Sequence, residues 1–147
     1  MKVLVDTNVV LDSLLGRDPF FDKSDKLIKI CGDKKADGFL AAHSITNMFF
    51  IIQKNYDIDD CRDILLNLFE IFQIEQVDAE RLKAALRNAN FDDIEDGLQN
   101  ECAVAVHADY IVTRNKKDFQ NSTIPCIDPD EFLQMFAEDQ ETEESVN

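Results

Sequence analysis

The chain has 147 residues and a formal net charge of −15 at pH 7. A single domain of this length buries enough surface to form a hydrophobic core without disulfides or structural metals. The charge excludes a protein that holds nucleic acid by a broad basic surface, because that mode of binding needs many lysines and arginines facing phosphates. It does not exclude an enzyme that cleaves nucleic acid at a small acidic site.

Cysteine use and hydropathy bear on the compartment. The cysteines are far apart in the sequence and form no Cys-X-X-Cys pair, which favours reduced core residues over zinc ligands or disulfides. They are Cys31, Cys61, Cys102 and Cys126. No apolar stretch reaches transmembrane length, and the N-terminus lacks the pattern of a signal peptide. We therefore expect a soluble, cytoplasmic protein with no membrane contact.

The first predicted element is a short apolar strand, Val3 to Val5, that ends on Asp6. Such a run fits a strand buried on both faces of a parallel sheet, and ligands of open α/β sheets bind where the strands end. Asp6 is therefore a candidate site residue. Taken alone, it has an equally good interpretation as the cap of the next helix, because aspartate at a helix start accepts hydrogen bonds from free N–H groups.

Helices and strands alternate through the rest of the chain. In chain order, the pattern after Asp6 predicts a helix at 9–15, a helix at 22–31, a strand at 39–42, and two amphipathic helices that begin at Ser44 and at Asp59 or Asp60. There follow a strand at 73–77, a helix from Asp78, a helix at 94–106, strands at 110–113 and 125–127, and a helix from Asp128 that ends by about Ala137.

This alternation predicts an α/β protein with a three-layer α/β/α fold and a mostly parallel central sheet. We expect one domain over residues 1–137. Residues 138–147 are nearly all polar and mostly acidic, and we expect them to form a disordered tail.

Acidic residues lie at three places that this topology brings to one edge of the sheet. Asp6 follows the first strand, Asp93 and Asp96 open a helix, and Asp118 follows the strand at 110–113. Strand ends and the helix starts that follow them share one edge of a parallel sheet. Crowded carboxylates repel one another unless a cation intervenes, and Mg²⁺ and Mn²⁺ favour oxygen ligands. The sequence therefore predicts a divalent metal site.

Each acid also has a simpler interpretation. Acids in the first turn of a helix, here Asp92, Asp93, Glu95 and Asp96, cap free N–H groups and complement the helix dipole. That role explains one or two of these four but not easily all of them. Asp118 follows a run of polar residues and, taken alone, could equally be a turn residue.

Three segments, in this order and spacing, resemble the signatures of PIN domains. They are Lys2 to Asn8, Asp93 to Leu98, and Asp109 to Phe119. The resemblance spans residue 2 to about residue 136 and looks closest to the bacterial branch that contains VapC-like toxins, to which the segment Leu11 to Phe20 is also similar. Each motif alone is modestly specific, whereas the three together are a strong signal.

The resemblance implies a PIN-like fold and a metal-dependent endoribonuclease that hydrolyses RNA phosphodiester bonds with Mg²⁺ or Mn²⁺. It also implies a toxin restrained by a small antitoxin protein, and a homodimer. The implied catalytic and metal-binding acids are Asp6, Asp96 and Asp118, with Asp93 as a fourth metal partner and with Asn8, Asn47 and Asn115 as supporting polar residues.

Two positions depart from the usual PIN pattern. Typical PIN nucleases carry a Glu in the helix after the second strand, where this chain has Asn47, and an amide ligand adds no charge to a metal site. Many relatives also have an Asp where Asn115 stands, although Asp118 can substitute for it. A second hypothesis is therefore a catalytically weakened PIN-like module that acts by binding protein or RNA.

Candidate RNA contacts are the bases on loops expected near the acids, namely Arg17, Arg114, Lys116 and Lys117. For any one of them, ordinary solvated surface charge is the simpler interpretation. Phe20 and Phe21 could stack on RNA bases, but we expect both to pack in the core.

Overall fold

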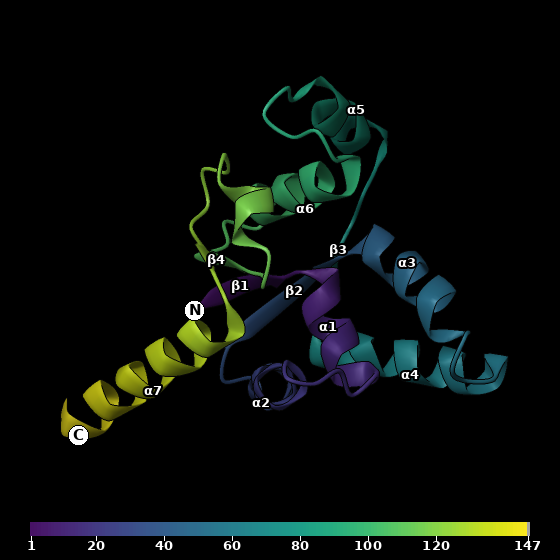
Figure 1. Cartoon of the computed structure of the whole chain (residues 1–147). Coiled ribbons are helices and arrows are strands. Elements are labelled where there is room, and N and C mark those ends of the chain that lie inside the picture. The colour runs from purple at the N-terminus through teal and green to yellow at the C-terminus, as the bar shows by residue number, and fades with distance from the viewer. Residues whose placement is uncertain (147) are drawn as a thin grey trace.

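The computed structural model describes residues 1–146. Its centre is a five-stranded sheet in the order β3-β2-β1-β4-β5, in which every neighbouring pair of strands is parallel (Figure 1). The strands are β1 (Lys2–Val5), β2 (Asp37–Ala41), β3 (Gln73–Glu75), β4 (Tyr110–Val112) and β5 (Cys126–Ile127). The predicted α/β class with a parallel central sheet is confirmed.

β1 is the middle strand because it is apolar on both faces. Val3, Leu4 and Val5 are completely buried. Val3 and Val5 point into one core cluster and Leu4 into the other, as the two-residue period of a strand requires. A strand with sheet neighbours on both sides and cores on both faces needs this continuous apolar run. The central position of β1 delivers Asp6 to the middle of the C-terminal edge of the sheet.

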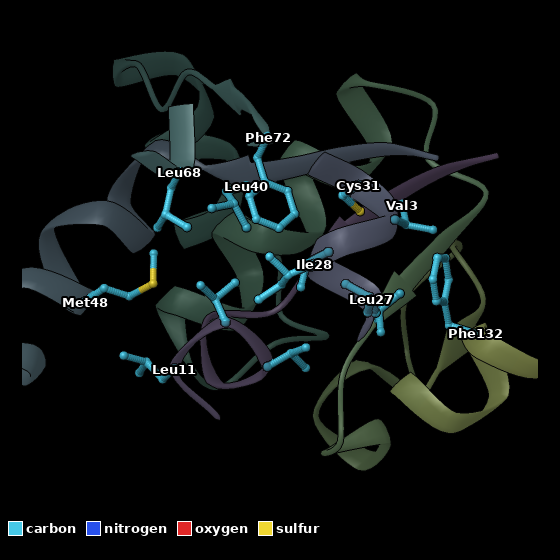
Figure 2. Close-up of a cluster of buried hydrophobic side chains, with 14 of the residues drawn as sticks. Val3, Leu11, Leu27, Ile28, Cys31, Leu40, Met48, Leu68, Phe72 and Phe132 are labelled. Atoms are coloured by element: carbon cyan, nitrogen blue, oxygen red, sulfur yellow. The ribbon is translucent and has the colours of Figure 1, made fainter. Parts of the chain in front are cut away.

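Helices cover both faces of the sheet, which gives the predicted three layers (Figure 1). Residues 1–146 form α1 (Thr7–Leu14), α2 (Phe21–Gly32), α3 (Ala42–Ile52), α4 (Ile58–Ile71), α5 (Ala79–Arg87), α6 (Ile94–Ala105), α7 (Pro129–Val146) and a short 3-10 helix (Lys116–Phe119). The larger core cluster packs α1, α2, α3, α4 and α7 against one face. Figure 2 shows this cluster, with Leu11, Leu27, Met48, Leu68 and Phe132 converging on it from these five helices.

The second face is covered by α6 and by Phe119 of the short 3-10 helix, and α5 packs against α6. Cys102 and Ala103 of α6 contact the face that carries Leu4, Phe39 and Ile111. All four cysteines are free thiols, as expected. Within residues 1–146, no helix is both long enough and apolar enough to cross a membrane.

The last helix differs from the sequence expectation. α7 continues to Val146, so its expected end near Ala137 is wrong. Its distal part is rich in glutamate and glutamine, which are good helix formers, and the Thr142 hydroxyl donates to the Glu138 carbonyl oxygen over 3.0 Å. Asn147, the end of the expected tail, lies outside the described residues. The division of the chain into residues 1–137 and 138–147 stays a prediction.

Candidate active site

Asp6 sits at the C-terminal end of β1 and is only 5 % exposed. Its Oδ1 accepts a hydrogen bond of 2.7 Å from Gln99 Nε2, and its Oδ2 accepts one of 2.9 Å from the Thr113 hydroxyl. Although Asp6 occupies the N-cap position of α1, its side chain makes no capping hydrogen bond there. The carboxylate is therefore held chiefly by α6 and by the residue that follows β4.

The surroundings of Asp6 favour a neutral acid unless a positive charge is nearby. Burial raises the pKa of Asp6 above its ordinary value, and the hydrogen bonds from Gln99 and Thr113 act against that shift. The Asp118 carboxylate adds a smaller repulsion in the same direction as burial. Gln99 itself is buried, and within the described residues its Oε1 has no hydrogen-bond partner. Gln99 therefore donates to the Asp6 carboxylate through Nε2 while its own Oε1 remains an unused acceptor.

Asp93 and Asp96 open α6, and they have different surroundings. Asp93 is the N-cap, and its Oδ1 accepts hydrogen bonds from the backbone N–H groups of Glu95 (2.8 Å) and Asp96 (3.1 Å). The capping role considered from the sequence is therefore real for Asp93. Asp96 is half-buried and lines a cavity together with Asp93 and Asp118.

The pKa of Asp96 is raised to about 7, first by partial burial and then by the nearby negative charges. These charges belong, in order of effect, to Asp93, Asp118, Asp6 and Glu95. The fold therefore brings carboxylates from three separate segments of the chain close enough to repel one another. Asp93, Asp96 and Asp118 also line one cavity of about 190 Å³, together with Lys117.

Within residues 1–146, no three side chains of His, Cys, Asp or Glu are arranged so that they would hold a metal ion directly. The donor chemistry nevertheless fits Mg²⁺ or Mn²⁺, because every candidate ligand offers oxygen. The charge fits as well, because a divalent cation would relieve the repulsion that raises the pKa of Asp96.

The supporting polar residues predicted from the sequence differ in their contacts with the acidic residues. The backbone N–H of Asn115 donates to the Thr113 hydroxyl over 3.0 Å, and that hydroxyl in turn donates to Asp6. Asn8 and Asn47 lie half-buried on α1 and α3. Of the described residues, neither of these two is among those that line the acidic cavity.

The predicted RNA-binding bases are mostly engaged with acids of the protein. Arg17 and Arg114 both pair with Asp12, whose side chain is 1 % exposed: Arg114 Nε lies 2.8 Å from Oδ2 and Arg17 Nη1 lies 3.6 Å from Oδ1. Lys116 Nζ lies 2.6 Å from Glu131 Oε1. Lys117 is the base that the fold places at the acidic cavity.

Several residues that contact the predicted site residues are absent from the sequence-based prediction. The sequence could have indicated a buried ion pair at Asp12, because this acid follows an apolar run in α1 and Arg17 comes five residues later. Gln99 lies three residues after Asp96, close to one helical turn, and Thr113 directly follows β4, but nothing in the sequence singles out either. The expected core packing of Phe20 and Phe21 is wrong, because both rings are exposed at the start of α2, where Phe20 stacks against Arg114.

Comparison with known proteins gives one family and a group of related structures. A family model described as PIN domain matches residues 2–117. One similar structure is VapBC2 from Rickettsia felis, bound to a DNA fragment from the VapBC2 promoter. It is 15 % identical with a TM-score of 0.63, and the match covers 87 % of this chain and 98 % of that chain.

Two further structures agree. DNA-bound VapBC from Salmonella typhimurium is 12 % identical with a TM-score of 0.66, covering 88 % of this chain and 98 % of that chain. FitAcB from Neisseria gonorrhoeae is 17 % identical with a TM-score of 0.57, covering 86 % and 97 %. No curated protein sequence matches the chain. At these identities the structural matches establish the fold.

Proposed function

The chain belongs to the PIN domain family, and from this premise we propose that it is a metal-dependent endoribonuclease that hydrolyses RNA phosphodiester bonds. The observation that carries the proposal is that Asp93, Asp96 and Asp118 line one cavity, where the pKa of Asp96 is raised by burial and then by the charges of neighbouring acids that include Asp118 and Asp6. Three carboxylates from distant segments have no structural need to meet there, and acids with strongly shifted pKa values cluster at functional sites.

We assign Asp6, Asp96 and Asp118 as the catalytic, metal-binding acids and Asp93 as a fourth partner. When bound, Mg²⁺ or Mn²⁺ supplies positive charge that polarises the scissile phosphate and acidifies water. The rest of the site belongs to the chain itself. Gln99 and Thr113 fix the orientation of Asp6, as groups behind a metal ligand commonly do. Lys117, on the same cavity, is positioned to attract the phosphate of a substrate.

The biological role that fits this family branch is that of a cytoplasmic toxin with a small antitoxin partner. The structurally similar proteins are VapBC and FitAB complexes. We also propose a homodimer. Its support is a group of large apolar side chains that α3 and α4 leave exposed, since clustered apolar surface marks protein interfaces. These residues are Phe50, Ile58, Leu66 and Phe69.

Asn47 supports a second candidate function, in which the site binds RNA or protein without turnover. The residue lies half-buried on α3, where the family usually supplies an acid, and its amide brings no charge to the site. The two candidates differ in whether the purified protein cleaves RNA.

The test is cleavage of single-stranded RNA by the purified chain with added Mn²⁺ or Mg²⁺. We expect Asp6→Asn and Asp96→Asn each to lower the rate about 100-fold or more, since even residues behind a metal ligand contribute 10- to 100-fold. Asp59→Asn is the matched control, because Asp59 is a 91 % exposed acid on α4. Equal cleavage by the wild type and both site variants would indicate a contaminating nuclease and would refute the enzyme assignment.

A further inference from the structure

A second cavity, of about 440 Å³, lies at the start of α2 and α7 and takes no part in the site described above. Its wall includes Phe20, Ser24, Arg114 and Pro129. It is larger than the acidic cavity, which measures about 190 Å³. Cavities of roughly 300–1,000 Å³ are the usual size for small organic ligands.

The two cavities flank one loop. Arg114 lines the larger cavity, whereas Lys117 and Asp118, a few residues later on the same loop, line the acidic one. The larger cavity is also bordered by Asp128, which directly follows β5 and therefore lies at the same C-terminal edge of the sheet as Asp6. The two cavities are therefore lined by residues only three or four positions apart in the chain.

Ser24 indicates that the cavity is built to hold a polar ligand. The residue is completely buried on α2, it lines the cavity, and its hydroxyl has no hydrogen-bond partner within the described residues. Buried hydroxyl groups are almost always hydrogen-bonded, because an unpaired one loses its hydrogen bonds to water and gains none in return. A ligand edge with a donor or an acceptor would supply the missing partner.

The charges around this cavity are already compensated by the protein. Arg114 Nε pairs with Asp12 at 2.8 Å, and Lys23 Nζ pairs with Asp130 at 2.8 Å. Asp128 Oδ1 accepts a backbone hydrogen bond of 2.8 Å at the start of α7. The third acid of the wall, Asp128, lies 3.9 Å from Lys116 Nζ. Because each charged side chain of the wall has a partner of opposite charge in the protein, the wall favours an uncharged polar ligand over a phosphate or a free cation.

The shape of the wall favours a flat ligand. The Arg114 guanidinium lies 4.3 Å from the centre of the Phe20 ring, so that the two form one stacked platform. Phe20 remains 40 % exposed, so part of the ring is free to contact a ligand. Unpaired RNA bases are bound by stacking on aromatic rings and on arginine planes, with hydrogen bonds to their edges.

We propose that this cavity binds one nucleobase of single-stranded RNA, stacked against Phe20 and Arg114 and hydrogen-bonded to Ser24. The phosphate backbone then crosses the loop from Arg114 to Asp118 and presents a phosphodiester to the acidic cavity. The choice of RNA rests on the proposed function. The cavity would therefore select the base that stands near the cleavage point.

The direct test uses free adenosine, guanosine, cytidine and uridine, which have no phosphodiester and cannot be cleaved. Each is titrated into the wild-type chain while backbone amide signals are followed by NMR. We expect at least one nucleoside to shift the signals of Ser24 and Arg114. Phe20→Ala should weaken that binding about 5- to 150-fold, since base stacking on an aromatic ring contributes about 1–3 kcal/mol.

The controls separate stacking from general damage. Phe20→Tyr keeps an aromatic ring and should bind like the wild type. Leu86→Ala removes an exposed apolar side chain on α5, which is 72 % exposed and lies outside the proposed dimer surface, and should have no effect on binding. Ser24→Ala should change the ranking of the four nucleosides, because it removes the hydroxyl that contacts the base edge.

Several results would overturn the proposal: no shift with any nucleoside, equal behaviour of Phe20→Ala and Leu86→Ala, or equivalent shifts with inorganic phosphate alone. Shifts at the cavity that only a peptide produces would make it a protein-docking site and would also overturn the proposal.

A kinetic arm distinguishes failure of this inference from failure of the nuclease assignment. If RNA is cleaved and Phe20→Ala has the KM and the base preference of the wild type, the base site is refuted while the nuclease stands. If nucleosides bind at the cavity but RNA is not cleaved, the base site stands and the nuclease assignment is refuted.

Discussion

Two buried or half-buried acids at the same edge of the sheet have opposite electrostatic surroundings. Asp12 is completely buried, and its charge is met by Arg17 and Arg114. Asp96 is less buried, yet its nearest charged neighbours are other carboxylates, and its pKa rises to about 7. Burial of an acid is therefore a poor sign of a functional site in this protein. The sign that distinguishes the two acids is a missing counter-charge.

The same substitution at the two acids should change stability in opposite directions. Asp12→Asn removes the charge that Arg17 and Arg114 share and should lower the free energy of unfolding by about 3 kcal/mol. That value is at the low end for a broken buried pair, because both arginines reach solvent. Urea denaturation of the wild type and the variant at pH 8 measures the difference. An unchanged unfolding midpoint would mean that Asp12 is not a structural ion-pair partner.

Asp96→Asn should instead stabilise the metal-free protein at pH 8. The pKa of Asp96 in the folded chain, about 7, lies above its ordinary value of 3.8. Between these values the folded state binds more protons than the unfolded state, so the free energy of unfolding falls as the pH rises from about 4 to about 7. We expect this loss to be about 1–2 kcal/mol, reduced from the full shift because the side chain is partly exposed to solvent.

The measurement compares urea denaturation of the wild type and Asp96→Asn at pH 5 and pH 8 with a chelator present. The difference between the two proteins should grow with pH, and added Mn²⁺ should raise the stability of the wild type alone. A difference that does not depend on pH would show that Asp96 is an ordinary surface acid.

Asn47→Glu adds a carboxylate, whereas the two variants above each remove one, and it should have the smallest effect of the three. It returns a carboxylate to the helix position that carries one in typical PIN nucleases. We expect Mn²⁺ to bind about 3- to 10-fold more tightly, which is below the 10- to 100-fold typical of groups that orient metal ligands, because Asn47 does not line the acidic cavity. Isothermal calorimetry against the wild type measures the change, and Asn55→Glu, an exposed position just beyond α3, is the control. Weaker binding by Asn47→Glu would place Asn47 away from the metal.

The sequence predicted the parts of this molecule that depend on local pattern. The apolar run before Asp6 predicted the central parallel strand, and the rule for strand ends predicted that acids would gather at one edge. Both depend on periodicity and topology, which a single chain displays directly.

The sequence did not predict which distant residues form pairs. Arg114 meets Asp12 across 102 positions of sequence, and no local pattern reports such a contact. For the same reason Arg17 and Arg114 were interpreted as free bases, and Phe20 was assigned to the core. Its exposure follows from the position of the ring at the α1–α2 connection, where Arg114 covers part of it. Acidic composition predicts an end of α7 near Ala137, whereas the helix propensity of the same glutamates carries the helix to Val146.

The position of Asp6 on β1 has a consequence for how the acids respond to a ligand. The Asp6 backbone N–H donates to the Val112 carbonyl oxygen over 2.9 Å inside the sheet, whereas Asp118 lies exposed on a single 3-10 turn. Amides in central strands exchange with solvent only when the whole domain unfolds, and those in short exposed turns exchange by local opening. The proposed metal site thus joins a part with global stability to a part with only local stability, and a binding cation is expected to slow exchange mainly at the Asp118 turn.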